Sequence, residues 1–147
     1  EGFSLALETS SYTLITIARQ ASKYFSESGG SVISMTFDAS NRVYPGYNVM
    51  GIAKAALENI NRQLSAEYGP RKIRFNSISA GPLPSLSARS IPGFTEMRKA
   101  HEQRSPIKRP ITHEEVANTA LFLVSDLSTG ITGSIIPVDG GYGIIAL

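Results

Sequence analysis

Tyr47 and Lys54 are the side chains whose types and spacing best suit them to chemistry, because they stand seven positions apart in a stretch with helical periodicity. Seven positions are nearly two turns of an α-helix, so both side chains would face one site, about 10 Å apart along the helix axis. A lysine ammonium near a phenol favours the phenolate, lowers the pKa of the tyrosine and keeps further donors free for hydroxyl groups. The spacing alone nevertheless favours a packed tyrosine and an ordinary solvated lysine, since many helices carry such a pair.

The segment from Ala80 to Ser85 is the second candidate for chemistry. It contains Pro82 and Pro84 and follows an expected strand, so it must be a loop. In open α/β sheets, ligands bind outside the carboxyl ends of the strands, where this loop would lie. The backbone amide and carbonyl of Leu83 could then present a rigid edge to a flat polar ligand. A stiff turn without a ligand fits the local sequence equally well.

Helices and strands that could position these groups alternate along the chain. The expected helices span residues 10–25 (capped by Thr9 or Ser10), 47–68, 90–105 and a segment after Thr112, and the expected strands span residues 31–36, 73–78 and 131–138. Thr112 and Glu115 fit a capping box, in which each side chain satisfies a free backbone amide. The alternation predicts an α/β fold with a parallel sheet covered on both faces. Three strands form a small sheet, which indicates that one edge is missing from this polypeptide.

Composition argues against several classes of function. The 147 residues contain 14 Lys and Arg against 12 Asp and Glu, and neutral sequence separates the short basic groups, so we expect no nucleic-acid partner. No apolar run approaches the ~20 residues of a membrane helix, so we expect no membrane insertion. The chain has no Cys, and His101 and His113 lack partners at ligand spacing, so we expect no metal site. The motifs G-x-S-x-G and G-x-G-x-x-G are both absent, which removes the usual serine-hydrolase elbow and the dinucleotide fingerprint.

Three segments carry a likeness to a known family: residues 47–55 (YNVMGIAKA), residues 80–86 (AGPLPSL), and residues 126–141, in which DLS, GITG and VDGG follow in order. Together they resemble the NADH-dependent enoyl-acyl-carrier-protein reductases of the short-chain dehydrogenase/reductase superfamily, and the likeness runs over essentially the whole chain. The resemblance implies the later half of a Rossmann-like, doubly wound parallel sheet with flanking helices. Residues 1–147 would be the C-terminal part of a single domain, with the N-terminal cofactor-binding half absent.

The spacing within this resemblance indicates the reaction. Carbonyl-reducing members carry Tyr-x3-Lys, but Met50 stands four positions before Lys54, and Tyr-x6-Lys is the enoyl-reductase pattern. The resemblance therefore implies an enoyl-[acyl-carrier-protein] reductase of fatty acid biosynthesis. In that reaction a hydride passes from NADH, or alternatively NADPH, to C3 of a trans-2-enoyl thioester.

The resemblance also assigns roles to residues. Tyr47 would hydrogen-bond the thioester carbonyl and stabilise the enolate, and Lys54 would hold the nicotinamide ribose hydroxyls. The Leu83 backbone and the Ser85 hydroxyl would bind the nicotinamide carboxamide. The remaining expected cofactor contacts are Gly81 and Pro82, and the expected acyl-pocket residues are Phe37, Met50, Ala80, Leu86, Ile91 and Phe94. Phe37 stands where many bacterial members have a second tyrosine, and Ser85 where Thr is frequent.

Partners follow from the same resemblance. We expect an acyl thioester carried by acyl carrier protein or coenzyme A, a cytoplasmic homotetramer assembled through residues 131–147 and the 47–68 helix, and a complementing N-terminal half. This chain alone should bind NADH poorly. Two alternatives remain: a reductase acting on 3-oxoacyl carbonyls, and a non-catalytic half-domain that assembles with a partner chain and ignores NADH.

Overall fold

The computed structural model describes residues 1–89 and 91–145 and contains one sheet of parallel strands. The strands are β1 (Gly30–Thr36), β2 (Ile73–Ala80) and β3 (Ile135–Val138), in the order β1-β2-β3. Gly30 pairs with Ile73 at one end of the β1–β2 register and Thr36 with Ser79 at the other. The predicted α/β fold with a parallel sheet is therefore confirmed. Residue 90, where a helix was expected to begin, and residues 146 and 147 of the expected interface segment lie outside the described residues.

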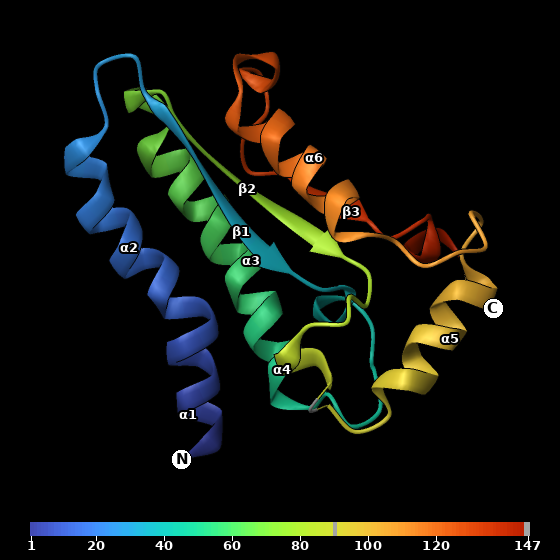
Figure 1. The fold of residues 1–147 in the computed structure, drawn as a ribbon. Coiled ribbons are helices and arrows are strands. Elements are labelled where there is room, and N and C mark those ends of the chain that lie inside the picture. Colours follow the sequence, from blue (N-terminus) through green and yellow to red (C-terminus); the bar gives the residue numbers. More distant parts are fainter. Residues whose placement is uncertain (90, 146–147) are drawn as a thin grey trace.

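Helices flank the sheet on both sides. The α-helices of the described residues are α1 (Gly2–Leu7), α2 (Thr13–Ala21), α3 (Val49–Tyr68), α4 (Leu86–Arg89), α5 (Phe94–Arg104) and α6 (His113–Val124). Figure 1 shows α2 beside α3 on one side of the strands and α6 on the other. In the described part of the chain, no helix is long and apolar enough to cross a membrane.

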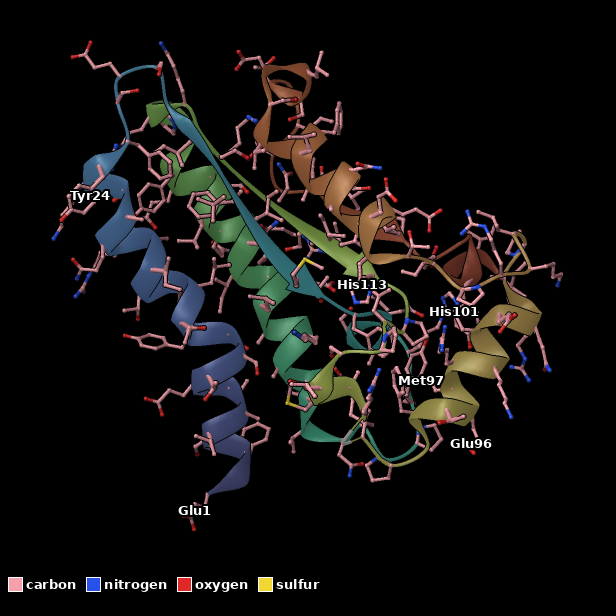
Figure 2. All side chains as sticks on the ribbon, in the orientation of Figure 1. Glu1, Tyr24, Glu96, Met97, His101 and His113 are labelled. Carbon is pink, nitrogen blue, oxygen red and sulfur yellow. The ribbon has the colours of Figure 1, made fainter. Side chains whose placement is uncertain are left out.

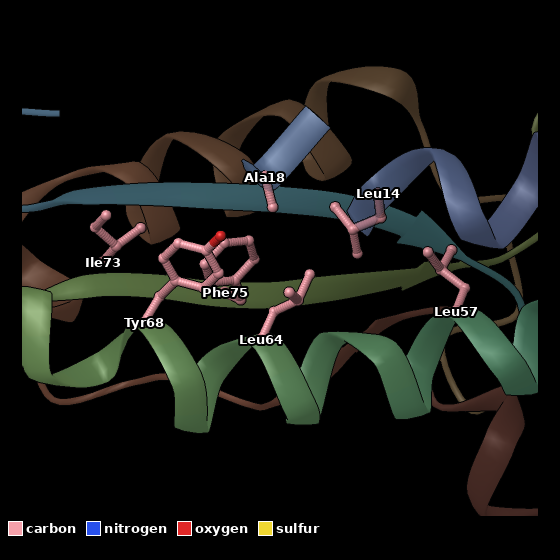
Figure 3. Packing of buried hydrophobic residues seen from close by; sticks show 7 residues of the cluster. All are labelled: Leu14, Ala18, Leu57, Leu64, Tyr68, Ile73 and Phe75. Atoms are coloured by element: carbon pink, nitrogen blue, oxygen red, sulfur yellow. The ribbon is translucent and has the colours of Figure 1, made fainter. Parts of the chain in front are cut away.

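Two apolar clusters pack against opposite faces of β2, because alternate residues of a strand point to opposite faces. Ile73 and Phe75 join α2 and α3 in one cluster, whose members are Leu14, Ala18, Leu57, Leu64, Tyr68, Ile73 and Phe75 (Figure 3). Ile78 joins Ile111, Val116 and Leu123 in the other. Since Phe75 and Ile78 are at most 1% exposed, β2 is the buried centre of the fold.

The N-terminal helix differs from the expectation. It begins at Gly2 rather than at residue 10, and Thr9 and Ser10 lie inside a π-helical turn that links α1 to α2. Ser11 in that turn is 2% exposed and donates from Oγ to the carbonyl of Ala53 at 2.7 Å. This contact with α3 spans 42 positions, so local capping signals could not reveal it.

The other predicted elements are close to the observed ones. Thr112 and Glu115 form the predicted capping box, with the Glu115 amide donating to Thr112 Oγ1 at 3.2 Å and the Thr112 amide to Glu115 Oε2 at 2.8 Å. The third strand begins at Ile135 instead of residue 131, because Gly133 has a positive φ of 72° that interrupts the extended backbone. The Gly133 amide still donates to the Phe75 carbonyl at 2.7 Å, which holds the irregular segment before β3 beside β2.

Candidate active site

A cavity of about 190 Å³ lies at the carboxyl ends of β1 and β2, where ligands bind in open α/β sheets. Most of the predicted site residues line it: Phe37, Tyr47, Lys54, Ala80, Gly81, Pro82, Leu83, Ile91 and Phe94. Met35, Thr36, Ala88 and Met97 complete the lining. The topology thus brings together groups from the end of β1, the start of α3, the loop after β2 and helix α5.

A larger hollow, of about 610 Å³, lies at the amino ends of the strands, where Gly30 and Ile73 line it. It contains neither Tyr47 nor Lys54. Its basic residues are Lys72 and Arg74, and Arg74 already donates to the carbonyls of Ile131 and Leu123. We place the candidate active site in the smaller cavity, because Tyr47 and Lys54 line it together with the loop after β2.

Tyr47 lies in the turn immediately before α3, which begins at Val49. The Met50 amide donates to its carbonyl at 3.1 Å, and its ring meets the Phe37 ring edge-on with centroids 5.3 Å apart. Burial raises the pKa of the Tyr47 hydroxyl. The expectation that Lys54 would lower this pKa is wrong in this structure, because desolvation by the surrounding apolar wall dominates. Tyr47 is therefore a neutral hydrogen-bond donor at ordinary pH.

Lys54 extends from the second turn of α3 toward the end of β1. Its Nζ donates to the carbonyl of Met35 at 3.0 Å, which leaves the other ammonium donors available. Burial lowers the pKa of Lys54, and the carboxylate of Glu58 opposes that shift. The lysine is thus anchored to the strand while its side chain lines the cavity.

The loop after β2 is held close to the neighbouring segments. The Gly81 amide donates to the carbonyl of Val138 at 2.9 Å, and a Cβ at position 81 would lie 2.7 Å from Nε2 of His101. His101 is 4% exposed, and its ring stacks on Tyr142 with centroids 4.5 Å apart. Figure 2 shows Met97 and His101 on α5. The loop conformation therefore depends on packing against α5 and the C-terminal segment.

Three predicted site residues are not among those that line the cavity: Met50, Ser85 and Leu86. The Ser85 hydroxyl accepts the Ala88 amide at 3.1 Å and so caps the short helix α4, and the Leu86 side chain is 89% exposed. The Leu83 carbonyl accepts the Ser85 amide at 2.8 Å, which turns the chain into α4. Ser85 thus belongs to the turn into α4, and Leu86 is the exposed first residue of that helix.

Sequence reasoning missed several residues around the cavity. Met97 follows Phe94 at helical spacing, so the periodicity of the 90–105 segment could have indicated it. Thr36 and Glu58 carried no signal, because a lone buried threonine and a glutamate within a helix look like ordinary structural residues. Across residues 1–89 and 91–145, no group of three or more His, Cys, Asp or Glu side chains could hold a metal ion.

Comparisons with known proteins agree with this architecture. A family model described as enoyl-(acyl carrier protein) reductase matches residues 1–143. The NADH-dependent FabI reductase of Synechocystis is 49% identical over 147 residues, which are 100% of this chain and 57% of that protein. The NADPH-dependent FabI of Staphylococcus aureus is 46% identical, over 99% of this chain and 56% of its own length.

A solved structure gives the same result. The Bacillus cereus enoyl-acyl carrier protein reductase, crystallised with NADP⁺ and an indole naphthyridinone, superposes with a TM-score of 0.96 at 44% identity, covering 99% of this chain and 56% of that one. The chain thus spans about half the length of the relatives it matches. Since the family model matches nearly all of its residues, the chain belongs to the enoyl-(acyl carrier protein) reductase family.

Proposed function

We propose that this chain provides the tyrosine–lysine portion of an enoyl-thioester reductase active site. The reaction is reduction of a trans-2-enoyl thioester, carried by acyl carrier protein or coenzyme A, at C3. The observation that carries this proposal is the presence of Tyr47 and Lys54 in the wall of one cavity at the Tyr-x6-Lys spacing of the family.

The residues of the cavity fit the nicotinamide end of a dinucleotide. Lys54 retains ammonium donors for ribose hydroxyls, and the Leu83 carbonyl has a second lone pair for a carboxamide beyond its bond to the Ser85 amide. Gly81 has no side chain, so it lines the cavity with backbone, and Pro82 lines the cavity beside it. Bound NADH or NADPH would supply the hydride.

Tyr47 acts on the substrate in this proposal. Its neutral hydroxyl donates to the thioester carbonyl oxygen and stabilises the negative charge that develops there as C3 is reduced. Phe37 holds the Tyr47 ring by its edge-on contact, so the hydroxyl keeps a fixed position. Ala80, Ile91 and Phe94 supply apolar wall for the acyl chain.

We further propose that a second portion completes the fold. Among the described residues, β1 pairs only with β2, so its other edge can accept one more strand. The chain covers only 57% of the Synechocystis reductase. An N-terminal half that adds strands at β1 and holds the rest of the dinucleotide would complete both the sheet and the cofactor site. A homotetramer in the cytoplasm is the assembly that we propose for the completed enzyme.

Oxidation of NADH tests the proposal directly. The purified chain is assayed with a trans-2-enoyl thioester and, as the comparison, a 3-oxoacyl thioester, with and without the N-terminal portion of the Synechocystis reductase as a separate polypeptide. We expect enoyl-dependent oxidation when the two portions are combined. Oxidation of NADH with the 3-oxoacyl thioester but not with the enoyl thioester would instead indicate a carbonyl reductase. Binding of the two portions without oxidation of NADH would favour the non-catalytic alternative.

A further inference from the structure

The turn that leads into Tyr47 is closed by Tyr44. The Tyr47 amide donates to the Tyr44 carbonyl at 3.0 Å. Pro45 and Gly46 occupy the two central positions of this turn. Gly46 has a positive φ of 84°, and a proline followed by such a glycine is the pattern of a type II turn. The Tyr47 side chain therefore depends on this turn for its place in the cavity wall.

The Tyr44 side chain supports Tyr47 a second time, through Phe37. The rings of Tyr44 and Phe37 have centroids 4.8 Å apart, and Phe37 in turn meets the Tyr47 ring edge-on at 5.3 Å. Aromatic rings in tilted and edge-on arrangements at these separations attract each other. A change of the Tyr44 ring therefore reaches Tyr47 through Phe37, independently of the turn.

A carboxylate anchors the Tyr44 ring. The Tyr44 hydroxyl donates to Asp38 Oδ2 at 3.2 Å, and Arg42 Nε lies 3.5 Å from the same oxygen. Burial, and then the Asp38 carboxylate, raise the pKa of Tyr44, so its hydroxyl remains a donor. The Arg42 guanidinium also donates to the carbonyls of Gly143 and Ile145. Asp38 and Arg42 thus tie the Tyr44 side chain to the C-terminal segment.

The Tyr47 hydroxyl itself is available to a ligand. No side-chain or backbone group of the described residues forms a hydrogen bond with it, and burial is the cause of its raised pKa. The position of this hydroxyl is therefore set by the ring and the turn that carry it. Because a hydrogen bond weakens steeply with poor distance and angle, a small displacement would cost much of its effect on a substrate.

We propose that Tyr44 is a positioning residue that fixes the hydroxyl of Tyr47 in the cavity. Its carbonyl closes the turn, and its ring, held by Asp38, supports Phe37. Tyr44 is not among the residues that line the cavity, so it acts through Tyr47 rather than on the substrate. Its value for catalysis rests on the proposed function, whereas the placement of the Tyr47 ring by Tyr44 does not.

Nuclear magnetic resonance measures this placement on the chain as it stands. The measured quantity is the nuclear Overhauser signal between the ring protons of Phe37 and Tyr47. Tyr44→Leu removes the supporting ring and should weaken this signal, whereas Tyr44→Phe keeps the ring and should retain most of it. Tyr24→Leu, the same change at a tyrosine that is 89% exposed, is the matched control and should leave the signal unchanged. An unchanged signal in Tyr44→Leu, folded by circular dichroism, would overturn the proposal.

Two substitutions at Gly46 test the turn without altering any ring, and they decide the question should Tyr44→Leu not fold. No atom lies within 4 Å of a Cβ built at position 46, so a side chain there meets no obstacle. Valine strongly disfavours the positive φ of 84°, whereas asparagine adopts a positive φ more readily. We expect Gly46→Val to weaken the signal between Phe37 and Tyr47 and Gly46→Asn to retain it. Equal signals in the two folded variants would contradict the role of the turn.

The enzyme completed by the N-terminal portion of the Synechocystis reductase gives the functional readout. Tyr44→Leu should lower kcat roughly tenfold, because a misplaced hydroxyl stabilises the transition state less well. KM for NADH should change less, because Lys54 would still bind the cofactor. Tyr44→Phe should retain most of the wild-type kcat.

A double variant separates positioning from a merely structural role. In the Tyr47→Phe background the hydroxyl is already absent, so adding Tyr44→Leu should cause little further loss of kcat. The same fold loss in both backgrounds would contradict the inference. If no enoyl reduction occurs at all, the proposed function fails, while the signal between Phe37 and Tyr47 still decides whether Tyr44 places the Tyr47 ring.

Discussion

Replacing Gly81 with alanine tests whether packing against α5 fixes the loop at the mouth of the cavity. A Cβ at this position would lie 2.7 Å from His101 Nε2, 2.9 Å from His101 Cε1 and 3.4 Å from Ile111 Cδ1. The first two distances are shorter than real Cβ contacts allow, so the imidazole or the loop must move. His101 has little room to retreat, because Tyr142 stacks on it with ring centroids 4.5 Å apart and the side chain is 4% exposed.

The expected cost of this substitution is that of overpacking a closed interior, about 1–3 kcal/mol of unfolding free energy. For a chain of this size, each kcal/mol corresponds to a fall of roughly 2–4 °C in Tm. Urea unfolding followed by circular dichroism measures the loss. Gly130→Ala is the matched control, because no atom lies within 4 Å of a Cβ built there and its φ is not in the left-handed region.

A double substitution identifies the clash as the cause. His101→Ala alone should destabilise the chain, because it leaves a void beneath the loop. In the Gly81→Ala, His101→Ala double variant, the new methyl group occupies part of that void, so the combined loss should be smaller than the sum of the single losses. The reasoning is refuted if Gly81→Ala is as stable as Gly130→Ala, or if the two losses simply add.

Two further predictions concern the site and a helix end. In the enzyme completed by an N-terminal half, Tyr47→Phe should lower turnover much more than it weakens NADH binding, whereas Lys54→Ala should weaken NADH binding. Steady-state kinetics measure turnover, and fluorescence titration measures NADH binding. Small, equal effects of the two substitutions would contradict the site assignment. Bonds from the Arg109 guanidinium and the Thr112 amide lower the pKa of Glu115 from 4.5 to about 2. Because the folded-state pKa is depressed, this stabilisation is present above pH ~4.5 and is lost as the pH falls toward ~2. Glu115→Gln should flatten the stability of the chain over that pH window in urea titrations, and an unchanged pH dependence would contradict the role of this carboxylate.

Local sequence determined most of the framework. Turn-forming residues bound the runs of strand-forming residues that become β1 and β2. The spacing of Leu57 and Leu64 places both side chains on the buried side of α3. Both patterns act within a few residues, so they can be identified in the sequence. The capping box at Thr112 is equally local and was predicted to the residue. The alternation of these elements was enough to predict a parallel sheet, and the segments 47–55, 80–86 and 126–141 together indicated the family.

Tertiary structure alone decided how the site is built. The bond of Thr36 to Glu58 and the contact of Gly81 with His101 join residues that are 22 and 20 positions apart, and no periodic pattern connects them. The pKa of Tyr47 also depends on the tertiary structure. The spacing from Lys54 predicted a lowered pKa, but burial raises it. Periodicity specifies which side of an element faces the core, whereas desolvation and close contacts depend on which elements meet there, and that is settled only when the chain folds.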